Sequence, residues 1–244
     1  MLKYYIINLK MILSIIIPTY NERKTIEKIV NRILKIKSLK KEIIIVDDAS
    51  NDGTSQLLKK KITRKVKKII YHKKNLGKGA AINSAKKFIS GKILIIQDAD
   101  LEYYPSDYKS LIKPIIKKKT KVVYGSRVLG REKKNYKSKY TSNIRILANY
   151  ILTLLSNLIN NQSLTDAHTC YKVFDTKIFK KISLNEKDFR FCPEVTCKIS
   201  RLGEKIIEIP IKYNGRKVID GKKIRFKDGI LAIICLFKYG LFVK

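Results

Sequence analysis

In the first half of the chain, short apolar runs alternate with segments whose apolar residues recur at helical spacing. The segments 12–17, 43–46, 66–71 and 93–96 are interpreted as strands, and 122–124 as a fifth. Between them, apolar residues stand three or four positions apart, which is typical of amphipathic helices. Buried strands that alternate with helices indicate a parallel sheet covered on both faces. The pattern therefore predicts an α/β fold with a mostly parallel central sheet.

Polar side chains follow the predicted strands at the points where the strands end. These segments are Pro18–Glu22, Asp47–Asp48, Asn75–Lys78 and Asp98–Asp100. In parallel sheets, ligands bind beyond the carboxyl ends of the strands. Hydrophobic periodicity alone does not require polar residues at these places, so we expect a binding site at this edge of the sheet.

The most acidic of these segments is QDADLEYYPSD, residues 97–107. Its carboxylates Asp98, Asp100 and Glu102 stand at alternate positions, which project to the same side if the chain is extended there. Their mutual repulsion calls for a positive partner, and a divalent cation is the usual one in proteins. The segment therefore predicts a metal site.

The second half of the chain has a different pattern. A polar, basic loop is expected from Gly125 to about residue 140, and an unusually apolar helix at 144–159. That helix belongs either to the core or to a lipid-facing surface. The segment 205–213 is strand-like, and a last helix begins at about Phe226.

Composition narrows the choice of partners. The chain carries 54 Lys and Arg against 20 Asp and Glu, a formal net charge of +34. Such an excess favours nucleic acid, an anionic membrane surface or phosphorylated substrates, although a general richness in lysine would also produce it. We expect no nucleic-acid partner, because no basic stretch interleaved with aromatics and glycines is present. The acidic pairs would also repel phosphates unless they held a metal.

Cysteine usage and hydropathy indicate the compartment. The four cysteines form no C-x-x-C pair, which argues against a zinc site or a disulfide framework and favours a reducing cytoplasm. No window reaches 18 uninterrupted apolar residues, and no convincing signal peptide precedes the first strand. We therefore expect a cytoplasmic protein without a membrane-spanning helix.

Ordered motifs carry a resemblance to a known family. IIIPTYNERKTI, IIIVDDASNDGT, NLGKGAAIN and IIQDADLEYYPSD, in this order and spacing, resemble the family 2 glycosyltransferases. The similarity is greatest to the dolichyl- and polyprenyl-phosphate sugar transferases, the group that includes dolichol-phosphate mannosyltransferases. VYGSR, LTDAHTCYKVF, FRFCPEVTCKISRLG and EIPIKYNGRKVIDGKKIRFKDGI extend the resemblance over nearly the whole chain.

The resemblance implies a fold and a reaction. The fold is the Rossmann-like nucleotide-sugar transferase fold called GT-A, with a helical C-terminal extension. A single domain would span 1–244, with a nucleotide-sugar half at about 11–125 and an acceptor half at about 126–244. The implied reaction moves a hexose from a nucleotide-diphosphate sugar, of the GDP-mannose or UDP-glucose type, to a polyprenyl or dolichyl phosphate. Mg²⁺ or Mn²⁺ is the implied cofactor.

The resemblance also implies roles for residues of the donor side. The nucleotide pocket would be lined by Pro18, Tyr20 and Glu22. Asp47 would contact the base or ribose, and Lys78 the edge of the nucleotide. The metal on the diphosphate would be held by Asp98 and Asp100, with Glu102 as a further ligand.

The acceptor side follows from the chemistry of a phosphate monoester. Its second pKa is about 6, so it is largely a dianion at neutral pH and needs cations rather than a general base. Arginine suits this task because its planar fork binds phosphate oxygens bidentately. The candidates are Arg127, Arg145, Arg216, Lys222 and Lys223, and with Asp98 and Asp100 we expect Arg127 and Arg216 to be catalytic. Attack from the face opposite the leaving diphosphate would invert the anomeric centre.

The sequence also leaves open an alternative class of acceptor and indicates a location at the membrane. A family 2 enzyme that uses a saccharide or protein hydroxyl would need a carboxylate base. Asp166, in LTDAHTC, is the available candidate. A basic face gains roughly 1 kcal/mol per well-placed Lys or Arg at an anionic membrane. We therefore expect the protein at the periphery of the inner membrane face.

Overall fold

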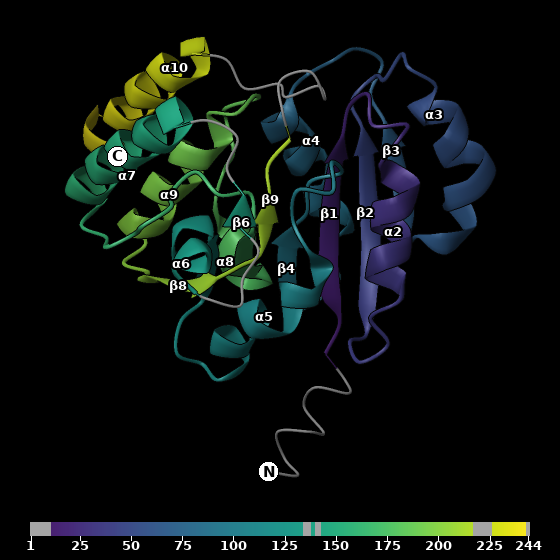
Figure 1. Ribbon diagram of the computed structural model, residues 1–244, viewed down its shortest axis with the longest axis horizontal. Coiled ribbons are helices and arrows are strands. Elements are labelled where there is room, and N and C mark those ends of the chain that lie inside the picture. The colour runs from purple at the N-terminus through teal and green to yellow at the C-terminus, as the bar shows by residue number, and fades with distance from the viewer. Residues whose placement is uncertain (1–10, 134–137, 140–142, 217–225, 243–244) are drawn as a thin grey trace.

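The computed structural model describes residues 11–133, 138–139, 143–216 and 226–242. Its centre is a seven-stranded sheet in the order β3-β2-β1-β4-β7-β5-β8 (Figure 1). The strands are β1 (Leu13–Thr19), β2 (Lys41–Asp47), β3 (Lys68–Tyr71), β4 (Ile93–Ile96), β5 (Val122–Ser126), β7 (Lys172–Asp175) and β8 (Ile206–Pro210). The five strands predicted in the first half are thus confirmed, within a few residues at each end.

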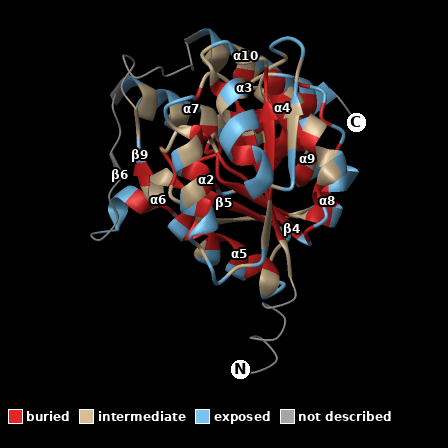
Figure 2. Ribbon diagram, turned by 90° about the vertical axis from the view of Figure 1, so that its right-hand side faces the viewer, coloured by how far each residue is buried: buried red, intermediate tan, exposed pale blue. Residues whose placement is uncertain are grey.

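The sheet is covered on both faces, as its sequence pattern indicated. Ile15, Ile16 and Ile17 are consecutive in β1, and each has 0% of its surface exposed. Because neighbouring residues of a strand point to opposite faces, burial of all three requires packing on both sides. Figure 2 shows the same concentration of buried residues in the central strands.

One strand departs from the parallel arrangement. β7 lies between β4 and β5 and runs antiparallel to both, with Leu94 opposite Phe174 and Val123 opposite Val173. Its sequence, KVFD, is short and begins with a lysine, so it carried no strand signal of its own. Lys172 is nevertheless fully buried.

Helices connect and cover the strands. They are α2 (Ile26–Leu34), α3 (Thr54–Leu57), α4 (Lys78–Ala85), α5 (Tyr108–Ile116), α6 (Arg127–Glu132), α7 (Asn143–Asn160), α8 (Thr176–Lys181), α9 (Phe191–Arg201) and α10 (Phe226–Phe237). The expected loop after Gly125 was wrong over α6. Ser126 caps that helix, because its hydroxyl accepts a hydrogen bond from the Leu129 amide at 3.0 Å.

The apolar helix at 144–159 is confirmed as α7, but most of it is not core. Its Leu155 and Ile159 pack with Cys197 of α9 and Leu236 of α10. Other apolar side chains of α7 are open to solvent, and Ile144 and Leu158 are 79% and 81% exposed. Within the parts of the chain that the structure describes, no helix combines the length and hydropathy needed to cross a bilayer.

A topological switch point lies beside β1, and we call the region beyond the carboxyl ends of β1 and β4 the crevice. The chain leaves β1 for β2 on one side, whereas β4, the neighbour on the other side, comes later. Such a switch point is where open α/β sheets bind ligands. A small second sheet pairs β6 (Ser138–Lys139) with β9 (Tyr213–Asn214), and an isolated bridge joins Tyr213 to Tyr103. The C-terminal part of the chain is thereby brought to the acidic turn.

Candidate active site

The acidic turn lies directly after β4, but its backbone is not extended. Residues 99–102 turn, and Leu101 adopts a φ of +68°. The side chain of Asp100 stabilises this turn, because its Oδ1 accepts a hydrogen bond from the Glu102 amide at 3.0 Å. The extended backbone on which the same-side arrangement was conditional is therefore not found here, although the carboxylates still lie close together.

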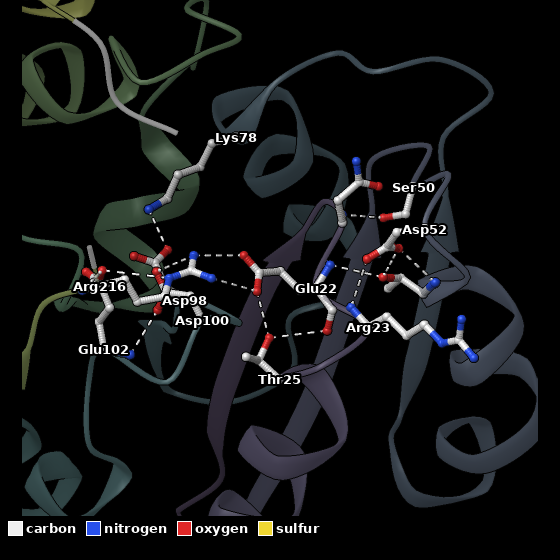
Figure 3. A network of polar contacts seen from close by, with 12 residues as sticks. Glu22, Arg23, Thr25, Ser50, Asp52, Lys78, Asp98, Asp100, Glu102 and Arg216 are labelled. Carbon is white, nitrogen blue, oxygen red and sulfur yellow. Dashed lines mark hydrogen bonds and ion pairs between the residues drawn. The ribbon is translucent and has the colours of Figure 1, made fainter. Parts of the chain in front are cut away.

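Two positively charged side chains form ion pairs with these carboxylates (Figure 3). The ammonium of Lys78, at the start of α4, lies 2.6 Å from Oδ1 of Asp98. The guanidinium of Arg216, which follows β9, lies 3.3 Å from Oδ2 of Asp100. Lys78 and the acidic turn thus meet beyond the carboxyl end of β4, as the strand pattern predicted, and Arg216 joins them from a part of the chain whose position that pattern did not predict.

The donor set at this turn suits a divalent cation. Burial raises the pKa of Asp100 to about 7, and the negative charges of Asp98 and Glu102 add to the rise. Arg216 opposes the shift only in part. A carboxylate held in this way gains from a bound cation of higher charge.

The predicted ligand set of three carboxylates is not assembled. Among the described residues, no three His, Cys, Asp or Glu side chains are grouped to hold a metal ion. Glu102 is engaged elsewhere: its Oε2 accepts a hydrogen bond from the Tyr213 hydroxyl at 2.6 Å, and its Oε1 accepts one from the Arg216 amide at 2.7 Å. Glu102 therefore fixes the C-terminal segment against the turn.

Glu22 lies at the crevice on the β1 side. It is buried, and its carboxylate accepts two hydrogen bonds from the guanidinium of Arg216, at 3.0 and 3.2 Å. The Thr25 hydroxyl donates to the same carboxylate at 2.6 Å. Pro18 lies within β1 and Tyr20 directly after it. Pro18, Tyr20 and Glu22 are thus all at or just beyond the carboxyl end of β1.

Asp47 and Asp48 end β2 and have different surroundings. Asp47 is buried and accepts hydrogen bonds from the hydroxyls of Ser50 and Ser55. Asp48 accepts a bond from Nδ1 of His72 at 2.6 Å. The role of Asp48 and His72 was missed, because nothing in the local pattern links them.

Asp48 also fixes the residue before Lys78. Its carboxylate accepts the amide of Gly77 at 2.7 Å, and Gly77 adopts a φ of +96°. A Cβ at Gly77 would lie 2.5 Å from the carbonyl oxygen of Lys187, so only glycine fits there. Lys78 thus begins α4 at a position held from two sides. Burial alone would lower the pKa of its ammonium, but Asp98 and the nearby thiol groups raise it overall.

Arg127 forms a second basic centre. Its Nε and Nη2 donate to the two carboxylate oxygens of Asp166, each at 2.7 Å. Its guanidinium also lies over the ring of Tyr213, 5.3 Å from the centroid. Tyr213, whose hydroxyl binds Glu102, therefore links this centre to the acidic turn, and its role was not visible in the sequence.

The remaining predicted residues are not brought into this cluster. Arg145 lies near the start of α7 and is partly exposed, and no ion pair joins it to the acidic turn among the described residues. Lys222 and Lys223 lie outside the described residues.

Comparison with known proteins places the chain in a family. The sequence model of Glycosyl transferase family 2 matches residues 14–183. A dolichyl-phosphate beta-glucosyltransferase of Trichomonas vaginalis is 30% identical over 241 residues, which cover 94% of this chain and 73% of that protein. The UDP-N-acetylglucosamine–dolichyl-phosphate N-acetylglucosaminyltransferase of Methanococcus voltae is 28% identical over 249 residues, covering 94% and 97%.

The fold agrees with that of a solved structure. The glucosyl-3-phosphoglycerate synthase of Mycobacterium tuberculosis, crystallised with Mn²⁺, UDP-glucose and phosphoglyceric acid, superposes with a TM-score of 0.74 at 15% identity. The match covers 99% of this chain and 84% of that one. The predicted GT-A type of α/β fold is thereby confirmed. The chain belongs to glycosyl transferase family 2 and is a glycosyltransferase.

Proposed function

We propose that this glycosyltransferase moves a hexose from a nucleotide-diphosphate sugar to the phosphate of a polyprenyl or dolichyl carrier. The observation that carries the proposal is that Asp98, paired with Lys78, and Asp100, paired with Arg216, lie together in the turn after β4. An acidic pair suits a metal-bound diphosphate, and an arginine suits a second phosphate. The names of two relatives, which act on dolichyl phosphate, support the acceptor class.

Asp98 and Asp100 are assigned the binding of Mg²⁺ or Mn²⁺. Their side chains are 22% and 15% exposed, so a donor's diphosphate can reach them. Bound there, the cation would neutralise the charge that gathers on the departing nucleotide diphosphate. Glu102, engaged by Tyr213 and the Arg216 amide, is assigned a positioning role in place of the predicted ligand role.

The donor would lie along the ends of β1 and β2. Pro18, Tyr20 and Glu22 border the nucleotide, and Asp47 faces its base or ribose. Lys78, fixed at the start of α4, supplies positive charge at the nucleotide edge. Parallel assays with GDP-mannose and UDP-glucose distinguish the two types of donor.

The chemical step needs no proton transfer from the acceptor. An oxygen of the lipid phosphate attacks the anomeric carbon, and the bond from that carbon to the donor's diphosphate breaks. The electron pair leaves with the nucleotide diphosphate. Attack from the opposite face inverts the anomeric centre. Arg127 and Arg216 are proposed to offset the repulsion between the two anions, with Arg145, Lys222 and Lys223 as further candidates.

The surroundings of Asp166 favour this acceptor over a hydroxyl. Asp166 is fully buried, and both its oxygens accept hydrogen bonds from Arg127. Although burial alone would raise its pKa, the charge and hydrogen bonds of Arg127 lower it overall. A carboxylate that is enclosed and stabilised as an anion is a poor general base.

The exposed side of α7 and α10 is proposed to face an anionic lipid surface. The two helices lie side by side (Figure 1). Their exposed apolar residues are Ile144, Leu147, Tyr150, Ile151, Leu154 and Leu158 on α7 and Ile230, Ile234 and Phe237 on α10. A patch of this kind on a chain of net charge +34 suits an anionic membrane, where apolar insertion and charge attraction add.

Acceptor choice tests the proposed reaction directly. Purified protein with Mn²⁺ is given GDP-mannose or UDP-glucose together with a short polyprenyl phosphate, the matching polyprenol or a free saccharide. The proposal expects transfer to the polyprenyl phosphate only, and a β-linked product from an α-linked donor. Transfer to the polyprenol or the saccharide at a rate similar to that for the polyprenyl phosphate would show that the acceptor's phosphate is not required and would overturn the proposal.

Vesicle binding tests the membrane face separately. Leu154→Glu should reduce sedimentation with phosphatidylserine-containing vesicles, whereas Leu202→Glu, a control at the end of α9 where Leu202 is 45% exposed, should not. Equal binding of both variants would exclude α7 as the contact. A change in oligomeric state without a change in vesicle binding would instead identify a second copy of the chain as the occupant.

A further inference from the structure

Arg216 contacts more carboxylates of the crevice than a residue that only binds the acceptor would need. Its guanidinium contacts Glu22 at 3.0 and 3.2 Å, Asp100 at 3.3 Å and, through Nε, Glu102 at 3.8 Å. One side chain therefore bridges the end of β1 and both ends of the turn after β4 (Figure 3). In this position it neutralises the carboxylates that a donor and its cation would use.

The attachment of Arg216 allows the guanidinium to move while the backbone stays. Its amide donates to Glu102 at 2.7 Å, and the neighbouring Tyr213 hydroxyl donates to the same carboxylate at 2.6 Å. Those two bonds do not involve the guanidinium. The side chain could therefore swing away from Asp100 about its own single bonds, and the segment that carries it would keep its place.

The other cations of the site are held differently. Lys78 is fixed at the start of α4, where Asp48 binds the preceding amide and Gly77 packs against the Lys187 carbonyl. Arg127 is locked by both oxygens of Asp166. Lys78 contacts the other proposed metal ligand, Asp98, at 2.6 Å, whereas Arg216 is the one of these three cations that contacts both Asp100 and Glu22.

We propose that Arg216 is an exchangeable counter-ion of the donor site, and that its exchange sets the order of binding. Without a donor, its guanidinium neutralises Glu22 and Asp100. When Asp100 instead binds a divalent cation together with the donor's nucleotide diphosphate, the guanidinium of Arg216 is released toward the acceptor's phosphate. The donor then binds before the lipid phosphate. This inference rests on the proposed function, because it needs a cation at Asp98 and Asp100.

Competition between Arg216 and a metal ion for Asp100 is tested by measuring the affinity for Mn²⁺. Electron paramagnetic resonance detects the free ion. In the absence of nucleotide, Arg216→Gln should bind Mn²⁺ about tenfold more tightly than the unmodified protein, a coupling of ordinary size for two linked sites. Arg23→Gln removes the same charge from the residue next to Glu22, but the Arg23 side chain points away from the carboxylates (Figure 3). This control should leave Mn²⁺ affinity nearly unchanged.

The possible outcomes distinguish a failure of the proposed metal site from a failure of the proposed counter-ion exchange. If the unmodified protein binds no Mn²⁺ even with a nucleoside diphosphate, the proposed metal site is wrong. If it binds Mn²⁺ with a nucleoside diphosphate, but Arg216→Gln has no higher affinity than Arg23→Gln, only the counter-ion exchange is wrong. An equal gain in both variants would indicate a general charge effect and would also overturn the exchange.

A second measurement uses the unmodified protein, so it does not depend on how a variant folds. Calorimetry compares binding of a short polyprenyl phosphate with and without Mn²⁺ and a nucleoside diphosphate. Release of Arg216 should tighten acceptor binding by about tenfold or more when both are present. Equal affinity in the two conditions would overturn the proposed order.

Discussion

Arg127 and Asp166 form a buried ion pair in which two guanidinium nitrogens each donate to a carboxylate oxygen at 2.7 Å. The Arg127 amide donates to the same carboxylate at 3.0 Å. The pair joins the start of α6 to the loop before β7, and it holds Arg127 beside Tyr213. Asp166 thus sets the position of a proposed acceptor ligand without facing the acceptor itself.

Removal of Asp166 is expected to act first on stability. Asp166→Ala leaves the Arg127 guanidinium buried without its counter-charge, which typically costs about 3–5 kcal/mol. Urea unfolding measures the loss, and we expect the midpoint to fall accordingly. A variant of unchanged stability that has lost transfer activity would instead identify Asp166 as a catalytic base and would favour a hydroxyl acceptor.

The strands and the donor side could be predicted from the sequence because their signals are local. Apolar runs mark β1, β2 and β4, and the polar residues just after them include Glu22, Asp98 and Asp100. Parallel pairing then brings these ends together by geometry alone. The same logic placed Lys78 at the crevice, because it follows β3 at the start of a helix.

The acceptor side could not be predicted to the same depth, because its contacts join residues far apart in the chain. Arg127 and Asp166 are 39 positions apart, and Arg216 and Glu22 are 194 apart. No periodicity encodes such pairs. β7 was missed for a related reason: its Lys172 is buried against the Ala167 carbonyl, at 2.7 Å, and the ring of Tyr124, 3.6 Å from the centroid, and neither partner is visible in the local sequence.

Asp100 is the carboxylate whose loss should separate catalysis from folding. Asp100→Asn keeps the side-chain oxygen that accepts the Glu102 amide, so the turn should persist. It removes the charge that would hold the metal, and transfer should fall by about a hundredfold or more. Asp52→Asn is the matched control, because the side-chain hydrogen bonds of Asp52 within the described residues come from Thr54 and from the Arg23 amide, in a turn away from Asp98 and Asp100. Full activity of Asp100→Asn in the presence of a chelator would refute the assignment.

Lys172 should give the protein a pH dependence in the alkaline range. Burial lowers the pKa of its ammonium to about 8, an effect that nearby Cys192 and Asp166 offset only in part. In the unfolded chain the pKa of a lysine is about 10.4. Between these values the unfolded state binds more protons, so the contribution of Lys172 to the free energy of unfolding rises with pH. Below about pH 8 the cost of the buried charge is fully present and constant.

The variant Lys172→Met isolates this contribution. Between about pH 8 and pH 9.5, the unmodified protein should gain stability relative to the variant by up to about 1.4 kcal/mol per pH unit. Loss of the hydrogen bond to Ala167 shifts the variant by an offset that does not vary with pH. Urea unfolding across this range gives the difference. Parallel curves for the two proteins would show that Lys172 stays charged when folded.

The final prediction concerns what the fork of Arg127 contributes to acceptor binding. Arg127→Ala would leave Asp166 buried and unpaired, so a loss of activity could reflect unfolding. Arg127→Lys keeps the positive charge beside Asp166, but its single ammonium nitrogen lacks the planar fork that pairs with both carboxylate oxygens and presents further N–H groups in fixed directions to a phosphate. The KM for a short polyprenyl phosphate should therefore rise about tenfold, the effect of one lost charge-assisted hydrogen bond. The affinity for the nucleoside diphosphate, measured by calorimetry with Mn²⁺, should change little, because Arg127 lies on the Asp166 side of Tyr213 and not at Asp100. If nucleotide affinity falls while the acceptor KM stays the same, Arg127 belongs to the donor site and the proposed division between the two arginines is wrong.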